Sequence, residues 1–235
     1  MAKRPPTFIE SPWPPFETRR RARDEKREAV LRMAVRLFLE QGYYRATLDE
    51  VAERLNITKP ALYNYFRGKD EILFECWMFG HERLNEAFLG IDAGGGDGLE
   101  KLRKLIRAYI ELMTTDFGAG LIRFDLRDLP EKNRETVRAA RKKVDHTFRE
   151  YIALGIEDGS IKLCDVKLSA FAIAGSLNWT AYWYQPGGAQ SPQAIGDEFA
   201  VRLTEGLVAK PSRKKALPAA SKAIVKNTPR RRAPK

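Results

Sequence analysis

Apolar side chains recur at intervals of three and four residues along most of this chain, which is the period of an amphipathic α-helix. No segment of useful length alternates apolar and polar residues as a half-buried strand would. We therefore predict an all-α protein. Its longer helices are expected over residues 24–41, 70–88, 99–115, 117–128, 131–155, 165–184 and 191–209, with two short helices between residues 47 and 66. Residues 90–98, GIDAGGGDG, predict a loop.

The stretch from residue 47 to residue 69, TLDEVAERLNITKPALYNYFRGK, predicts two short helices joined by a tight turn. Thr47 and Glu50 fit a capping box, in which each side chain accepts a free backbone N–H at the start of the first helix. Asn56 suits the turn, because asparagine tolerates left-handed backbone geometry. Thr58 is the expected N-cap of the second helix, and Pro60 falls in its first turn, where a missing N–H costs little.

The second short helix has two different faces when its residues are placed at about 100° each. Leu62 and Phe66 share the face that we expect to anchor the helix to its domain. The opposite face is small and polar, which suits close approach to a DNA major groove, where an asparagine can pair with adenine and flanking groups can hold phosphates. An ordinary surface helix is the alternative, and spacing alone does not separate the two. The candidate DNA contacts are Thr47, Thr58, Lys59, Pro60, Ala61, Tyr63, Asn64, Tyr65 and Lys69.

Residues 30–69 resemble the N-terminal domain of TetR-family transcriptional regulators. The matching residues are Val30, Ala34, Leu37, Phe38, Gly42 and Tyr43, then Thr47, Val51 and Ala52, then Leu62, Tyr63, Tyr65, Phe66 and Lys69. Pro60 and Ala61 depart from the small pair, such as Gly-Thr, that many members carry, which leaves the base preference open. The resemblance implies a three-helix DNA-binding head followed by a helical body that binds a small effector and forms a homodimer.

Length and composition fit that organisation. The 235 residues suffice for a head of roughly 50 residues and a regulatory body. We predict a flexible basic arm over residues 1–23, the head over 24–69, an effector-binding and dimerisation domain over 70–209, and a disordered basic tail over 210–235. No apolar run approaches the ~20 residues that span a bilayer, the start of the chain is too rich in proline for a signal peptide, and the two cysteines lie far apart. A cytoplasmic protein without a cofactor or metal site is expected.

The net charge of +11 is concentrated at the two ends of the chain. Residues 210–235 contain ten lysines and arginines and no acidic residue. Spread basic residues of this kind add salt-dependent, sequence-independent affinity for DNA, although a solubilising tail is the alternative. Near the other end, arginines directly before the head are expected to grip phosphates or enter a minor groove, and these are Arg19, Arg20, Arg21 and Arg23.

Residues 165–184 form the most apolar predicted helix of the body. A helix that is apolar on nearly every side must be buried by its own fold and by a partner, so we expect it to build a homodimer interface together with residues 191–209. The end of this helix is also rich in aromatic residues. It resembles the corresponding block of a TetR subgroup that responds to acyl-coenzyme A thioesters, whereas plain core or interface packing is the alternative. The candidate effector contacts are Met113, Phe117, Arg123, Phe124, Phe148, Asn178, Trp179 and Trp183, with Arg138, Arg141 and Lys142 as further candidates for the entrance.

Two other functions compete with that of a ligand-responsive regulator, most simply a repressor. An enzyme would need a convergent nucleophile, base or metal set, and the two histidines, His81 and His146, fall in separate predicted helices without metal-like spacing. A nucleoid-type protein that binds any DNA through its basic ends is the second alternative. A specific regulator would differ from it by a large affinity ratio for one operator over random DNA.

Overall fold

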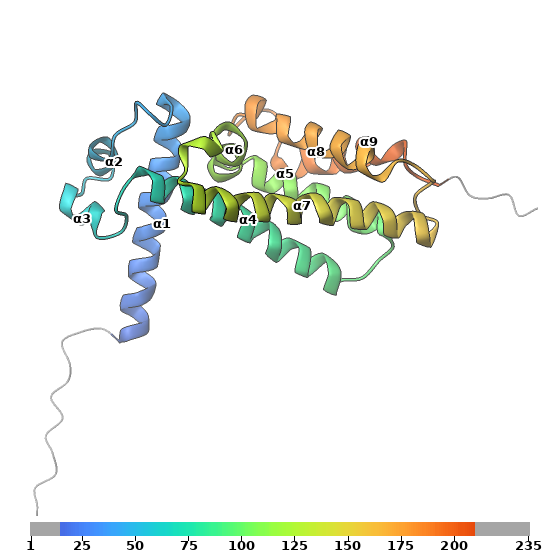
Figure 1. The fold of residues 1–235 in the computed structure, drawn as a ribbon, viewed down its shortest axis with the longest axis horizontal. Helices are drawn as coiled ribbons and strands as arrows, with labels where there is room; N and C mark the ends of the chain where they lie inside the picture. Colours follow the sequence, from blue (N-terminus) through green and yellow to red (C-terminus); the bar gives the residue numbers. More distant parts are fainter. Residues whose placement is uncertain (1–14, 210–235) are drawn as a thin grey trace, which may run out of the picture.

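The computed structural model describes residues 15–209, which form an all-α structure (Figure 1). Within this range there is no β-strand, and the only β-like pairing is an isolated antiparallel bridge between Ile161 and Val208. The helices are α1 (Phe16–Gln41), α2 (Leu48–Arg54), α3 (Lys59–Tyr63), α4 (Lys69–Ala93), α5 (Gly98–Met113), α6 (Asp116–Arg123), a 3-10 turn η1 (Leu126–Asp128), α7 (Glu131–Asp158), α8 (Val166–Trp183) and α9 (Pro192–Glu205).

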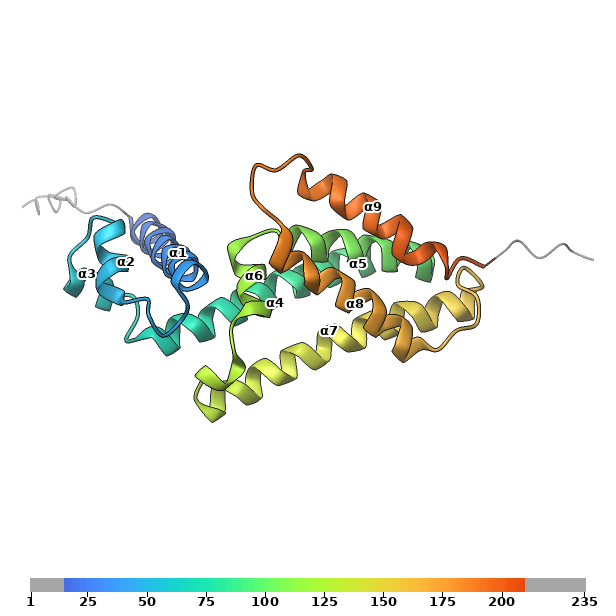
Figure 2. The same cartoon turned by 90° about the horizontal axis from the view of Figure 1, so that it is seen from above.

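The helices form a small head and a larger body. Helices α1, α2 and α3 lie together at one end of the molecule, and α4 runs from that head into the body (Figures 1 and 2). In the body, α5 packs extensively against both α9 and α7, and α8 packs against α5, α6 and α7. The short helix α6 contacts α1 of the head as well as α4 and α8 of the body, so it lies at the junction of the two parts.

Side-chain caps set the starts of the helices in the head. The capping box of Thr47 and Glu50 is present in both directions, and Thr58 accepts the backbone N–H of Ala61 at the start of α3. Asn56 has a φ of 52°, the left-handed geometry expected for the turn between α2 and α3. The predicted helix-turn-helix is therefore formed as the sequence indicates.

Helix α1 begins at Phe16, eight residues before the predicted start at residue 24. The segment lacks an apolar stripe, but its four arginines and Glu17 are good helix formers, and Arg21 pairs with Glu25 one turn later at 3.2 Å. Pro15 precedes the helix, where its fixed φ and missing N–H do no harm. The arginines before the head therefore lie on a helix and not in the predicted arm. Residues 1–14 and the basic tail over 210–235 lie outside the described residues.

The loop predicted over residues 90–98 is shorter than expected. Helix α4 continues to Ala93 because Ile91 still faces the core, and the chain leaves the helix only at Gly94. Gly95 and Gly96 then adopt φ values of 62° and 110°, which favour glycine. Helix α7 similarly extends to Asp158 before Gly159 ends it in a left-handed conformation.

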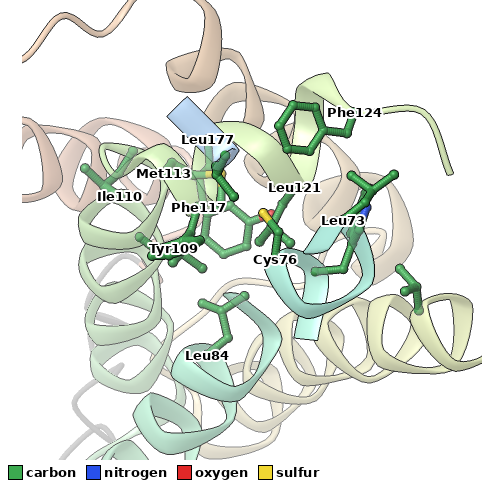
Figure 3. Close-up of a cluster of buried hydrophobic side chains, with 14 of the residues drawn as sticks. Leu73, Cys76, Leu84, Tyr109, Ile110, Met113, Phe117, Leu121, Phe124 and Leu177 are labelled. Carbon is green, nitrogen blue, oxygen red and sulfur yellow. The ribbon is translucent and has the colours of Figure 1, made fainter. Parts of the chain in front are cut away.

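The core of the body forms where four helices meet (Figure 3). Its buried side chains include Leu73, Cys76 and Leu84 of α4, Tyr109, Ile110 and Met113 of α5, Phe117 and Leu121 of α6, Phe124, and Leu177 of α8. A Cβ placed on Gly80 would come within 2.6 Å of the Leu121 side chain, so a glycine at this position lets α4 and α6 approach closely. Within residues 15–209, no helix is both long and apolar enough to cross a membrane.

Candidate DNA-binding surface and ligand cavity

Helix α3 is anchored to the head by the two residues that the sequence predicts. Leu62 is 0% and Phe66 is 1% exposed, and the guanidinium of Arg27 lies 4.6 Å from the centre of the Phe66 ring. The opposite face of α3 is turned away from the rest of the subunit. Pro60, Tyr63 and Asn64 are exposed there, while Ala61 and Tyr65 are half-buried on the flanks.

Other predicted DNA contacts already have partners within the head. The hydroxyls of Thr47 and Thr58 are N-caps, and the ammonium of Lys59 lies 2.9 Å from a carboxylate oxygen of Asp49. Thr47, Thr58 and Lys59 are all exposed to solvent. They lie around the outer face of α3, and Lys59 must exchange Asp49 for phosphate if it contacts DNA.

The sequence suggests that the ammonium of Lys69 is free to contact phosphate, but in the structure it has partners within the head. Its Nζ donates to the backbone carbonyl of Tyr44 at 3.3 Å and lies 4.7 Å from the centre of the Tyr43 ring. Partial burial lowers the pKa of Lys69 from its ordinary value. In this arrangement Lys69 ties the start of α4 to the turn after α1, so it supports the recognition surface from within the head.

The exposed arginines of α1 extend the basic character of the head. Arg19, Arg20, Arg21 and Arg23 are all solvent-exposed on its first turns. Tyr44 is a residue that the sequence analysis did not select: it is 80% exposed and lies beside Thr47, Tyr63 and Lys69 around a shallow depression. Tyr44 lies three residues beyond Gln41, and its hydroxyl donates to a carboxylate oxygen of Asp128; its place in the turn after α1 was the available signal.

A cavity of about 450 Å³, partly open to solvent, lies in the body and is lined by residues of α4, α5, α6, α7 and α8. This volume is typical of a site for a small organic ligand. Its lining is mostly apolar and consists of Trp77, His81, Leu84, Tyr109, Leu121, Ile122, Arg141, Val144, Asp145, Phe148, Ala170, Phe171, Ala174 and Asn178. Leu84, Tyr109 and Leu121 of this lining are labelled in Figure 3.

Two of the eight predicted effector contacts, Phe148 and Asn178, line this cavity. The buried side chains of Phe117 and Phe124 belong to the neighbouring core, and Met113 and Arg123 border a second hollow of about 470 Å³ between head and body. Trp179 and Trp183 are 62% and 41% exposed and face away from the cavity. These two residues lie outside this cavity, because the residues of α8 that line it are Ala170, Phe171, Ala174 and Asn178.

The polar groups of the cavity are concentrated on α4 and α7. His81 is 5% exposed and neither of its ring nitrogens has a hydrogen-bond partner in the structure, and the same holds for Nε1 of Trp77. Burial, with a smaller effect from the charge of Arg141, lowers the pKa of His81 to about 4. The Arg141 guanidinium lies 4.3 Å from the centre of the Trp77 ring and donates to the Leu121 carbonyl at 3.2 Å. None of Trp77, His81 and Tyr109 was selected from the sequence; the shared face of Trp77 and His81, four apart on α4, was the available signal.

Helix α6 connects this cavity to the head. Its Leu121 and Ile122 line the cavity, while its first residue, Asp116, accepts two hydrogen bonds from Arg36 of α1 at 3.0 and 3.2 Å. At its other end, Arg123 donates to the backbone carbonyl of Leu39 at 3.1 Å. Displacement of α6 by a ligand would therefore act directly on α1.

The head is a helix-turn-helix unit and the body encloses a ligand-sized cavity, which together define a DNA-binding transcriptional regulator. Residues 30–76 match the bacterial regulatory proteins of the tetR family, and residues 95–207 match a tetracyclin repressor-like C-terminal domain. This chain therefore belongs to the TetR family, whose members are transcriptional regulators and not enzymes.

Individual relatives agree with this assignment. The transcriptional repressor KstR2 of Mycolicibacterium smegmatis is 25% identical over 194 residues, which cover 77% of this chain and 90% of the relative. The crystal structure of the TetR-family regulator PfmR from Thermus thermophilus is 27% identical, with a TM-score of 0.69 over 76% of this chain and 98% of that one. The structure of AibR in complex with isovaleryl coenzyme A and operator DNA is 25% identical, with a TM-score of 0.65 over 74% of this chain and 96% of that one.

Proposed function

We propose that this chain is a homodimeric repressor that leaves its operator when a small acyl compound, most simply an acyl-coenzyme A thioester, occupies the cavity of the body. The observation that carries the proposal is the position of α6, which lines the cavity and also holds α1 of the head. One α3 from each subunit would enter successive major grooves about 34 Å apart.

An exposed apolar stripe on α8 supports the dimer. Its members recur every three or four residues on one face of the helix, and they are Leu168, Phe171, Ala172, Gly175, Trp179, Tyr182 and Trp183. Large exposed apolar surfaces of this kind mark interaction sites. Ala172 and Gly175 lie at the centre of the stripe, where their small size lets a second helix approach closely. A second copy of this chain is the natural occupant, since a two-fold axis would pair the stripe with itself.

The energy that the release of DNA requires is modest. A hundredfold loss of operator affinity corresponds to about 2.7 kcal/mol of coupling between the two sites. In the ion pair of Arg36 and Asp116, two guanidinium nitrogens donate to one carboxylate oxygen, and the pair is partly exposed, so it can be rearranged at small cost. A ligand that pushes Leu121 and Ile122 outward would move α6 and, through this pair, the orientation of α1.

The size and surroundings of the cavity support an acyl thioester. A volume of about 450 Å³ accommodates an acyl chain and its thioester, while the nucleotide would remain outside. Arg138, Arg141 and Lys142 form an exposed basic group on α7, and Arg141 also lines the cavity. Basic side chains at this position would suit the phosphates of a coenzyme A molecule. The similar protein AibR has been crystallised with isovaleryl coenzyme A.

Thermal unfolding with candidate effectors tests this proposal. Isovaleryl-CoA and longer acyl-CoA thioesters are expected to raise the melting temperature, because a ligand that binds only the folded state stabilises it, whereas free coenzyme A should have little effect. Ala174→Phe fills the cavity from α8 and should remove the shift. Ala153→Phe adds the same ring at an exposed position of α7 outside the cavity and should retain it. Equal shifts in both variants would place the ligand elsewhere, and no shift with any acyl compound would contradict the effector class.

A further inference from the structure

The cavity contains two buried polar side chains and one partly exposed arginine that a purely apolar ligand would leave unused. Trp77 and His81 lie on one face of α4, and the nitrogens of both side chains lack protein partners although they are buried. Arg141 reaches the same place from α7, with its guanidinium over the Trp77 ring and one nitrogen on the Leu121 carbonyl. Buried polar groups without partners are rare in proteins and are costly unless something else satisfies them.

These groups mainly donate hydrogen bonds. An indole N–H can only donate, a guanidinium has five N–H groups and no acceptor, and a neutral imidazole offers one donor and one acceptor. The nearby polar groups of the lining already have partners: Tyr109 donates to Asn178 at 2.7 Å, and Asp145 is paired with Arg149 at 2.6 Å. Trp77 and His81 stack on one another, Arg141 lies over the Trp77 ring, and all three line the cavity, so this part of the lining is complementary to an oxygen acceptor.

We propose that the effector places a carbonyl or carboxylate oxygen inside the cavity, where Trp77, His81 and Arg141 bind it. This inference rests on the proposed function, because it assigns the polar part of the ligand in the same cavity. It adds a specificity that cavity size alone does not provide: the oxygen, and not only the apolar chain, determines which compounds are bound. A thioester carbonyl and a free carboxylate both have the required chemistry.

Removal of the His81 ring nitrogens, which have no hydrogen-bond partner, should not lower the stability of the ligand-free protein. If His81 were a structural residue, its replacement would lower the melting temperature. If His81 instead serves ligand binding, an apolar side chain of similar size should not lower the melting temperature, because it removes buried nitrogens that lack hydrogen-bond partners. We expect His81→Leu to unfold at the same or a higher temperature than the parent protein in the absence of ligand.

The binding test compares two ligands that differ in one group. Isovaleryl-CoA carries the thioester carbonyl, and 3-methylbutyl-CoA is the thioether in which a methylene replaces it. The unaltered protein should bind the thioester about tenfold or more tightly by calorimetry, because the carbonyl gains hydrogen bonds from a charged donor. In His81→Leu and in Arg141→Met the two ligands should bind almost equally. Lys143→Met, an exposed substitution on α7 outside the cavity lining, should keep the preference.

A third ligand, isovalerate, distinguishes a thioester carbonyl from a free carboxylate as the source of the oxygen. The protein could bind isovalerate in a way that depends on Arg141 and bind neither coenzyme A compound. This result would support the oxygen site and refute the acyl-CoA effector of the proposed function. Equal binding of thioester and thioether by the unaltered protein would overturn the oxygen site and leave the acyl-CoA effector intact. A thioester preference that persists in both cavity variants would also overturn it. If none of the three compounds binds, both proposals fail for this class of ligand.

Discussion

Trp179→Glu is expected to convert the proposed dimer into monomers and thereby to remove tight operator binding. Trp179 is 62% exposed in the subunit and lies on the apolar stripe of α8. At the centre of an interface, a tryptophan typically contributes about 2 kcal/mol or more, and a carboxylate in its place would be buried without a partner. The dimer dissociation constant should rise by at least about 30-fold, which analytical ultracentrifugation over a concentration series measures.

Leu89→Glu is the matched control for this change. Leu89 is 73% exposed on α4, away from α8, so the same charge at this position should leave the protein dimeric. Operator affinity should follow the oligomeric state, because a monomer offers only one α3 to two half-sites. A Trp179→Glu protein that sediments as a dimer at the same concentrations as the parent would contradict the assignment of the interface to α8.

Asn64→Ala is expected to reduce the preference for the operator without a comparable loss of affinity for random DNA. Asn64 is exposed at the end of α3, on the side opposite the buried Leu62 and Phe66. A side-chain amide that pairs with an adenine discriminates against other bases by about 1–3 kcal/mol, which corresponds to a loss of roughly 5- to 150-fold in the affinity ratio. Fluorescence anisotropy with operator and unrelated duplexes measures this ratio.

Arg20→Ala provides the contrasting case. Arg20 is exposed on the first turns of α1, and of its two expected roles a phosphate contact would carry no sequence information. Its loss should weaken binding to all sequences alike and reduce the slope of the logarithm of the binding constant against the logarithm of salt concentration by about one. If Asn64→Ala instead weakens operator and random DNA equally, Asn64 does not read bases.

Much of the head could be predicted because its determinants are local. The capping box of Thr47 and Glu50, the left-handed Asn56 and the buried pair of Leu62 and Phe66 depend on residues only a few positions apart. The start of α1 was missed for the converse reason. An exposed segment rich in arginine forms a helix through propensity and the ion pair of Arg21 with Glu25, and it leaves no apolar stripe in the sequence.

The cavity was less accessible to sequence reasoning because distant helices build it. Arg141, His81 and Tyr109 come together only through the packing of α7, α4 and α5, and nothing in their local sequence shows that they share one space. The aromatic end of α8 shows the same limit. Periodicity placed Trp179 and Trp183 on one face, but it could not decide whether that face points to the cavity or to a partner. In the structure both are exposed.

Selection of DNA from a random pool by the protein shows whether the outer face of α3 reads a defined operator as part of a dimer. We expect enrichment of an inverted repeat whose half-sites are centred about 34 Å, or roughly 10 to 10.5 base pairs, or a multiple of that distance apart. Retention of all sequences alike, without an enriched repeat, would contradict it and would favour a protein that binds DNA through its basic ends.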